Sequence, residues 1–262
     1  MRFLTKSEIE SSSDTVISGR YGCKYLLPNI KESVAFEIFC NGIYEADTNE
    51  FLYGHLPANG VFLDLGANIG SVTIPLLKRR PDLKCICVEA APWIFDYLRK
   101  NRDINFSDES IILINKALMD RDGEVLPFYS PKEKFGKGSL SPVFTDVGTP
   151  VASITVDTIV KDYNLSTVDT IKIDIEGFEY FAFKGAENLL SGPNAPDILF
   201  EFVDWAERKA GLETGHAQRY LIEKGYQLYI PVKGQLKKCE QVIIEGTEML
   251  FASKKQSKFA TR

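Results

Sequence analysis

The sequence has few of the residues that build metal sites and disulfide frameworks. Its 262 residues include only two histidines, His55 and His216, and five cysteines. A histidine-rich metal site is therefore not expected, and an odd cysteine count argues against a disulfide framework. Cys85 and Cys87 fall inside a predicted buried strand, where a thiol packs as a small apolar group. We expect all five cysteines to be structural.

Long apolar runs and a strongly basic stripe are also missing. No stretch approaches the roughly 20 apolar residues that a membrane span needs, and the start MRFLTKSE becomes polar too early for a secretory signal. The 31 basic and 36 acidic residues are mixed along the chain, with a net charge of −5, so a phosphate backbone would find no basic path to follow. These absences predict a soluble, cytoplasmic protein that binds neither nucleic acid nor membrane; they leave its oligomeric state open.

The segment VFLDLGANIGSVT, residues 61–73, is the most informative part of the chain. The apolar run Val61–Leu65 predicts a buried strand, and two glycines then turn the chain into a helix that begins near Ser71. Such a helix start offers free N–H groups and a partial positive charge. The glycine spacing is G-x-x-x-G rather than the G-x-G-x-x-G of dinucleotide-binding proteins, and the G-x-S-x-G elbow of serine hydrolases is absent.

Two acids accompany this turn. Asp64 lies two residues before it, where a carboxylate repels phosphate and attracts a cationic amino or sulfonium group. Glu89 follows the next apolar run, at the place where an acid can hold ribose hydroxyls. Together they favour S-adenosylmethionine as the cofactor. An ordinary strand–turn–helix with an incidental acid is the alternative.

The alternation of apolar segments predicts an α/β fold, with a doubly wound and mostly parallel sheet. The expected strands are Val61–Leu65, Cys85–Glu89, Ile111–Asn115, Thr170–Ile175 and Ile198–Phe202. The expected helices are Ser71–Lys78, Trp93–Asn101, Phe178–Leu190 and Gln218–Lys224. Two final strands, Gln227–Val232 and Glu248–Ser253, are joined by a polar loop and are expected to pair antiparallel at the sheet edge.

Composition divides the chain into three parts. Residues 1–59 are expected to form a small appendage of strands and a helix, and residues 60–255 the main domain. Within that domain, residues 123–150 are rich in proline and glycine, which suits a hairpin and a mobile lid. Residues 256–262 are expected to be a frayed basic tail.

Charged side chains alternate with isoleucines in TIKIDIEG, residues 170–177, which puts Lys172, Asp174 and Glu176 on one face. A central parallel strand is normally apolar on both faces, so these charges indicate a face that lines a cavity. Glu201 ends the next expected strand and should lie nearby. An edge strand with surface charges is the alternative.

Asp174, Glu176 and Glu201 are the candidate catalytic residues, because a shielded carboxylate can accept the proton of a hydroxyl group. A second possibility is that the same three residues bind a divalent metal that lowers the pKa of the hydroxyl. We favour a site without metal. Lys172 is either an ion-pair partner that tunes Asp174 or a structural counter-charge.

Five short motifs give the chain a family resemblance. They are FLDLGANIG at 62–70, VEAAP at 88–92, NKAL at 115–118, KIDIEGFE at 172–179 and KGA at 184–186. With them the chain, from about residue 60 to 205, resembles the FkbM family of S-adenosylmethionine-dependent methyltransferases. One departure is Ala90, where the family usually has proline.

The resemblance implies a Rossmann-like class I methyltransferase fold that binds S-adenosylmethionine and leaves S-adenosylhomocysteine. The cofactor-binding residues that it implies are Glu45, Asp64, Gly66, Ala67, Asn68, Gly70, Glu89, Ala90, Ala117, Leu118 and Asp174. The glycine turn would surround the methionine part, Glu89 the ribose, and the backbone near Ala117 and Leu118 the adenine. Glu45 would close over the cofactor's amino group, and Asp174 would lie near the transferred methyl group.

The resemblance also implies an O-methyltransferase whose acceptor is a sugar, a polysaccharide precursor, or a glycosylated or polyketide-type small molecule. Lys172, Ser139 of the lid and the aromatic Trp205 are candidate acceptor-binding residues. Two alternatives stay open. A nicotinamide-dependent oxidoreductase is disfavoured by Asp64 and the missing glycine motif, and a non-catalytic nucleoside- or glycan-binding relative is disfavoured by the retained acids.

Overall fold

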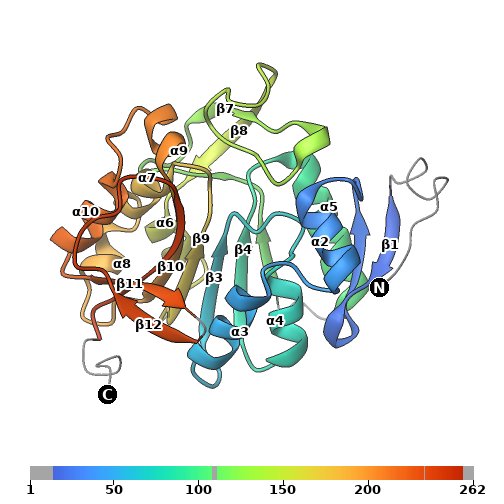
Figure 1. Cartoon of the computed structure of the whole chain (residues 1–262), viewed down its shortest axis with the longest axis horizontal. Helices are drawn as coiled ribbons and strands as arrows, with labels where there is room; N and C mark the ends of the chain where they lie inside the picture. Colours follow the sequence, from blue (N-terminus) through green and yellow to red (C-terminus); the bar gives the residue numbers. More distant parts are fainter. Residues whose placement is uncertain (1–13, 108–110, 233, 256–262) are drawn as a thin grey trace.

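The computed structural model describes residues 14–107, 111–232 and 234–255. An eight-stranded sheet crosses the molecule in the order β12-β11-β13-β10-β9-β3-β4-β5 (Figure 1). Five of its strands are parallel: β3 (Val61–Leu65), β4 (Lys84–Val88), β5 (Ile111–Ile114), β9 (Thr170–Ile173) and β10 (Asp197–Val203). The other three are antiparallel to their neighbours: β11 (Gln227–Val232), β12 (Gln235–Lys238) and β13 (Thr247–Ser253). The predicted mostly parallel α/β sheet is confirmed.

Helices cover both faces of this sheet, because neighbouring residues of each strand point in opposite directions. Leu63 of β3 belongs to a core cluster shared with the helices α6 (Val156–Asp162), α7 (Glu179–Lys184), α8 (Glu187–Ser191) and α10 (His216–Glu223). Phe62, one residue earlier, belongs to a second cluster shared with α3 (Ala46–His55), α4 (Thr73–Arg79) and α5 (Pro92–Asn105). None of the helices in the described ranges is long and apolar enough to cross a bilayer.

The edge of the sheet differs from the expectation. β11 and β13 pair antiparallel as predicted, but β13 lies between β10 and β11, and the outermost strand is β12. β12 falls within the segment expected to be a polar loop. This strand was not predicted because its sequence is polar. An edge strand is held by backbone hydrogen bonds and needs little apolar surface.

The helix expected over residues 178–190 is two helices, α7 and α8, which are separated at Gly185 and Ala186. A Cβ atom at Gly185 would lie 2.2 Å from the carbonyl oxygen of Met119. The chain therefore breaks its helix where it passes close to a neighbouring backbone. The short helices α6 and α9 (Asp204–Lys209) were not predicted.

Residues near the N-terminus pack on α5 through β1 (Thr15–Ser18), β2 (Lys24–Leu27) and α2 (Ser33–Asn41). The side chain of Asn101 on α5 accepts from the N–H of Leu26 at 2.6 Å and donates to its carbonyl at 3.2 Å. An asparagine thus takes the place of a third strand beside β2. The basic tail predicted for residues 256–262 lies outside the described residues.

A smaller sheet stands above the carboxyl ends of the parallel strands (Figure 1). It has the order β6 (Ala117–Leu118), β8 (Gly148–Ile154) and β7 (Val125–Tyr129), and β7 and β8 are antiparallel. The connection from β7 to β8 carries the short 3-10 helix η2 (Lys132–Lys134) and then crosses toward β9 and β10. It closes the upper side of the site described next.

Candidate active site

A cavity lies at the carboxyl ends of β3, β4 and β9; its empty space, counted together with the part open to solvent, is about 830 Å³. The predicted site residues that line it are Asp64, Gly66, Ala67, Asn68, Glu89, Ala90, Ala117, Leu118, Lys172, Asp174 and Glu176. The predicted residues that are not among its lining are Glu45, Gly70, Ser139, Glu201 and Trp205. The structure thus brings residues from four separate parts of the sequence to one crevice, as expected near the ends of parallel strands.

The glycine turn after β3 has a shape that side chains would obstruct. Gly66 has φ +86°, and a Cβ atom there would lie 1.9 Å from the backbone oxygen of Asp174. Gly70 has φ +85° and faces Ile74 and Leu98, so it shapes the turn without lining the cavity. Between them, Asn68 also has a positive φ of 53°. Such backbone favours glycine and asparagine, which explains the motif.

Glu89 is buried at the end of β4 and faces the glycine turn. One carboxylate oxygen accepts from the N–H of Asn68 at 2.9 Å and the other from the N–H of Ala91 at 2.8 Å. Burial raises the pKa of Glu89 to about 7, and the two backbone N–H groups oppose that rise. Each oxygen keeps a second lone pair, so Glu89 can still accept hydrogen bonds from ribose hydroxyls.

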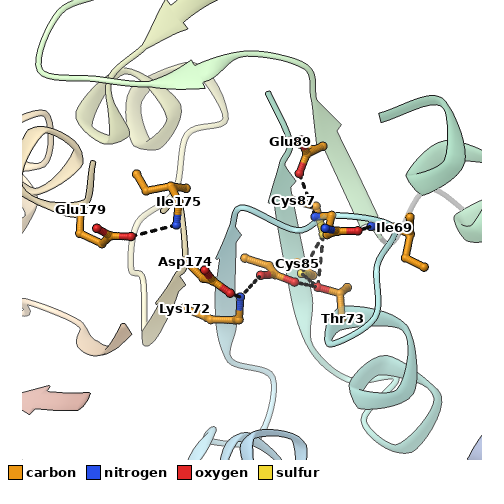
Figure 2. Close-up of polar contacts among 11 residues, drawn as sticks. Ile69, Thr73, Cys85, Cys87, Glu89, Lys172, Asp174, Ile175 and Glu179 are labelled. Atoms are coloured by element: carbon orange, nitrogen blue, oxygen red, sulfur yellow. Dashed lines mark hydrogen bonds and ion pairs between the residues drawn. The ribbon is translucent and has the colours of Figure 1, made fainter. Parts of the chain in front are cut away.

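A buried lysine lies between two carboxylates in the cavity wall. Lys172 Nζ lies 3.4 Å from Asp174 Oδ2, an approach visible in Figure 2, and 3.8 Å from Asp64 Oδ1. The hydroxyl of Thr73 donates to the other oxygen of Asp64. Burial alone would lower the pKa of Lys172, but Asp174 and Asp64 outweigh it and the pKa is raised. Lys172 is therefore charged and pairs with both acids.

Three buried carboxylate oxygens in this region lack a hydrogen-bond partner among the described residues: Asp64 Oδ1, Glu45 Oε2 and Glu176 Oε2. Burial raises the pKa of all three groups. An unsatisfied buried carboxylate is unfavourable, and a cation bound beside it would offset the cost. S-adenosylmethionine carries both an ammonium and a sulfonium group, so the residues present fit this cofactor.

Asp174, Glu176 and Glu201 form a cluster in which carboxylate oxygens lie within 4.8 Å of one another. Burial, followed by the charges of Asp174 and Glu176, raises the pKa of Glu201 to about 9. Burial and Asp174 also raise the pKa of Glu176, while Lys137, 2.6 Å away, lowers it. The two strand ends and the turn after β9 thus assemble the three acids that the sequence placed at neighbouring strand ends.

Three further residues of this region were missed. Tyr44 lines the cavity, and burial and then Glu45 raise the pKa of its phenol. Glu179 accepts from the N–H of Ile175 at 2.9 Å (Figure 2), and burial raises its pKa to about 8. Lys137 is the lysine that pairs with Glu176. Glu179 belongs to the motif at 172–179 and Lys137 to the predicted lid, while Tyr44 directly precedes Glu45; only the fold shows what they contact.

Ser139 and Trp205 do not line the cavity. The Ser139 hydroxyl donates to the backbone oxygen of Glu176 at 3.2 Å. Trp205 packs edge-on against Phe144, with 5.8 Å between ring centroids. Trp205 lies on α9, directly after β10. It therefore packs against the β7–β8 connection and does not line the cavity.

The sequence is similar to known methyltransferases. A model of the methyltransferase FkbM domain matches residues 64–228, more than half of the chain. The methyltransferase sdnD of Sordaria araneosa is 23% identical over 180 residues, an alignment that covers 58% of this chain and 67% of that protein.

Solved structures with a similar fold include a TehB-like SAM-dependent methyltransferase from Corynebacterium glutamicum, with a TM-score of 0.47, 14% identity, and coverage of 82% of this chain and 92% of that one. A precorrin-6y C5,15-methyltransferase from Geobacter metallireducens has a TM-score of 0.44 and 14% identity, with 80% and 86% covered.

The matched range begins at Asp64 and runs through every parallel strand after β3 into β11. The range therefore includes the glycine turn, Glu89 and the carboxylates after β9. In the sheet, the antiparallel strand β13 lies between β10 and β11. The chain belongs to the FkbM family of S-adenosylmethionine-dependent methyltransferases and has their Rossmann-like class I fold.

Proposed function

We propose that this methyltransferase methylates a hydroxyl group of a sugar, a polysaccharide precursor, or a glycosylated or polyketide-type small molecule. The observation that carries the proposal is the cluster of Asp174, Glu176 and Glu201 beside the cofactor cavity. A hydroxyl acceptor must lose a proton when it is methylated, and Glu201, with a pKa raised to about 9, is a stronger base than an ordinary carboxylate.

The chain's own residues have two tasks in this reaction. When bound, S-adenosylmethionine supplies an electrophilic methyl group. The new bond joins the acceptor oxygen to that carbon, the carbon–sulfur bond breaks, and the hydroxyl proton passes to Asp174 or Glu201. Holding the acceptor oxygen about 3 Å from the methyl carbon accounts for much of the rate. The residues of the cavity wall would provide this positioning.

The cofactor-binding roles are proposed on the same geometry. Asp64 and Glu45 each have a buried oxygen without a hydrogen-bond partner among the described residues, and these oxygens would accept from the ammonium group. Glu89 would hold the ribose, and the backbone of Ala117 and Leu118, which line the cavity, would border the adenine. Gly66 lets the backbone approach closely.

The surroundings of the carboxylates favour an uncharged, hydroxyl-rich acceptor. Asp174, Glu176 and Glu201 would repel a phosphate group, which argues against nucleic acid. Lys172 would act through Asp174, since it lies 3.4 Å from that carboxylate. Ser139 contacts Glu176 and would help to shape the acceptor-binding part of the site. Trp205 would contribute indirectly, by packing against Phe144.

Calorimetric titration of the purified protein with S-adenosylhomocysteine is the first test, with NAD as a parallel control. We expect binding of the former in the micromolar range and none of the latter. Sugars, glycosylated compounds and polyketide-type alcohols are then screened with methyl-labelled S-adenosylmethionine, and the label should appear as an ether. Exclusive labelling of nitrogen or carbon would contradict the proposal.

We also propose that the reaction needs no divalent metal. The ammonium group of Lys137, 2.6 Å from Glu176, already places a cation at the carboxylate cluster. Incubation with EDTA followed by desalting should leave turnover within about twofold of the untreated enzyme, and added Mg²⁺ should not raise it. A loss of activity that Mg²⁺ restores would instead assign the three carboxylates as metal ligands.

A further inference from the structure

Residues 135–141 of the β7–β8 connection form the upper wall of the cavity, and we call them the roof segment. Phe135, Gly136, Gly138 and Leu140 line the cavity. Phe135 is fully buried in the cluster that joins α2 and β2 to α5, which anchors one end of the segment. At the other end, the Ser141 hydroxyl donates to the backbone oxygen of Lys209 on α9 at 2.9 Å.

The middle of the roof segment is joined to β7 by two backbone hydrogen bonds between Ser139 and Tyr129, and across the cavity its side chains contact Glu176. Lys137 donates to Glu176 Oε1 at 2.6 Å, and Ser139 donates to the backbone oxygen of the same residue at 3.2 Å. The Lys137 side chain is 39% exposed and that of Glu176 is 6% exposed, so the carboxylate is the buried partner of the pair.

The turn that carries Glu176 is held rigidly. Glu176 has φ +53° and Gly177 has φ +98°, and a Cβ atom at Gly177 would lie 2.4 Å from the backbone of Ala206. Below the turn, Glu179 fixes the N–H of Ile175. A fixed turn is a suitable anchor, because a contact to it restrains the roof segment without moving the anchor itself.

The contacts of Glu176 differ from those of the other two acids. Among the three carboxylates, Glu176 is the one paired directly with a roof lysine, whereas Asp174 pairs with the buried Lys172. For Glu201, which belongs to β10, the described part of the chain shows no ion pair within 4 Å. A carboxylate that accepts from an ammonium at 2.6 Å is a weaker proton acceptor than one without such a partner.

We propose that Lys137 and Glu176 are a positioning pair, whose ion pair holds the roof segment over the cofactor cavity, and that proton acceptance falls to Asp174 or Glu201. The role in transfer rests on the proposed function; the closure of the roof does not. Opening the pair would let the roof segment rise from the cavity and would speed the departure of a bound nucleoside product.

Hydrogen exchange of the full-length protein without ligand tests the closure. Peptides that cover residues 130–147 should exchange about three- to tenfold faster in Lys137→Met and in Glu176→Gln, which is the range expected for loss of a partly buried contact. Lys137→Arg should keep the wild-type rate. The control is Lys132→Met, an exposed lysine of the same connection, which should exchange as wild type does.

Charge reversal separates an ion pair from ordinary packing. Lys137→Glu alone should open the roof segment, and the double variant Lys137→Glu/Glu176→Lys should restore slow exchange. Stopped-flow measurement should show S-adenosylhomocysteine leaving about three- to tenfold faster from the single variants. With an acceptor in hand, Glu176→Gln should keep the rise of kcat with pH, displaced to lower pH because the charge of Glu176 helps to raise the pKa of Glu201.

Unchanged exchange in both single variants, or no rescue in the double variant, would overturn the closure. A pH–rate profile that loses its basic dependence in Glu176→Gln would return Glu176 to the role of base. If the wild-type protein did not bind S-adenosylhomocysteine at all, the proposed function would fail, while the exchange measurements would still decide the closure.

Discussion

The Asp174→Asn variant is expected to lose methyl transfer, with kcat at least about 100-fold below wild type, because an amide cannot take the proton of the acceptor hydroxyl or stabilise charge beside it. Its fold should survive. Asparagine has nearly the same shape, and Lys172 retains Asp64, 3.8 Å away, as a partner. The affinity for S-adenosylhomocysteine should change by only a few-fold.

The measurement is turnover with methyl-labelled S-adenosylmethionine, accompanied by calorimetry of product binding and by circular dichroism. Asp162→Asn, which changes an exposed carboxylate at the end of α6, is the matched control and should behave as wild type. Unchanged turnover in Asp174→Asn would remove Asp174 from the mechanism. Intact binding with no transfer in the wild-type protein would favour a non-catalytic relative.

The dependence of kcat on pH shows which carboxylate is the base. A base acts when deprotonated, so if Glu201 is the base, wild-type kcat should rise with pH toward about 9, the raised pKa of its carboxyl group. Asp174 contributes to that rise in pKa, second to burial. Residual activity in Asp174→Asn should therefore reach its plateau at a lower pH. A wild-type profile without such a rise would argue against Glu201 as the base.

Gly66→Ala is expected to have the largest effect on stability of any single methyl addition in the glycine turn. The added carbon would lie 1.9 Å from the backbone oxygen of Asp174, and φ is +86°, a region that alanine avoids. The contact and the dihedral angle both belong to the backbone, so no side-chain rotation can relieve them. We expect the free energy of unfolding to fall by at least about 4 kcal/mol, together with loss of cofactor binding.

Urea denaturation followed by fluorescence measures this change. Gly54→Ala is the matched control: Gly54 is exposed on α3, and no atom lies within 4 Å of a Cβ built there. That variant should gain about 0.5–1 kcal/mol, because alanine is the better helix former. Equal stability of the Gly66→Ala variant and wild type would contradict the close approach of β3 and β9 at this turn.

Much of the cofactor side of the site was predictable from sequence, because its determinants are local. A glycine turn between a buried strand and a helix is formed by consecutive residues, and Asp64 and Glu89 lie at characteristic sequence separations from it. Parallel strands also bring their carboxyl ends to one edge, so the meeting of Asp174 and Glu201 followed from strand assignment alone.

The sheet edge and the helix break show why other features were not predictable. The strand β12 is polar and is held by backbone pairing, which leaves no apolar pattern to read. The break at Gly185 depends on the approach of Met119, which is 66 positions earlier in the sequence. A short stretch of sequence around β12 or Gly185 does not contain the residues that these segments contact.

By itself the sequence determined the α/β class, the glycine turn and the acids at the strand ends, since periodicity and short-range spacing encode them. Only the tertiary structure decided what covers the cavity. The roof segment is held by single contacts between distant residues, such as Lys137 with Glu176 and Asn68 with the carbonyl of Phe135, and nothing in the spacing of such residues specifies their partners. The same reason places Trp205 against Phe144 rather than in the cavity: packing between two connections depends on how the whole sheet positions them.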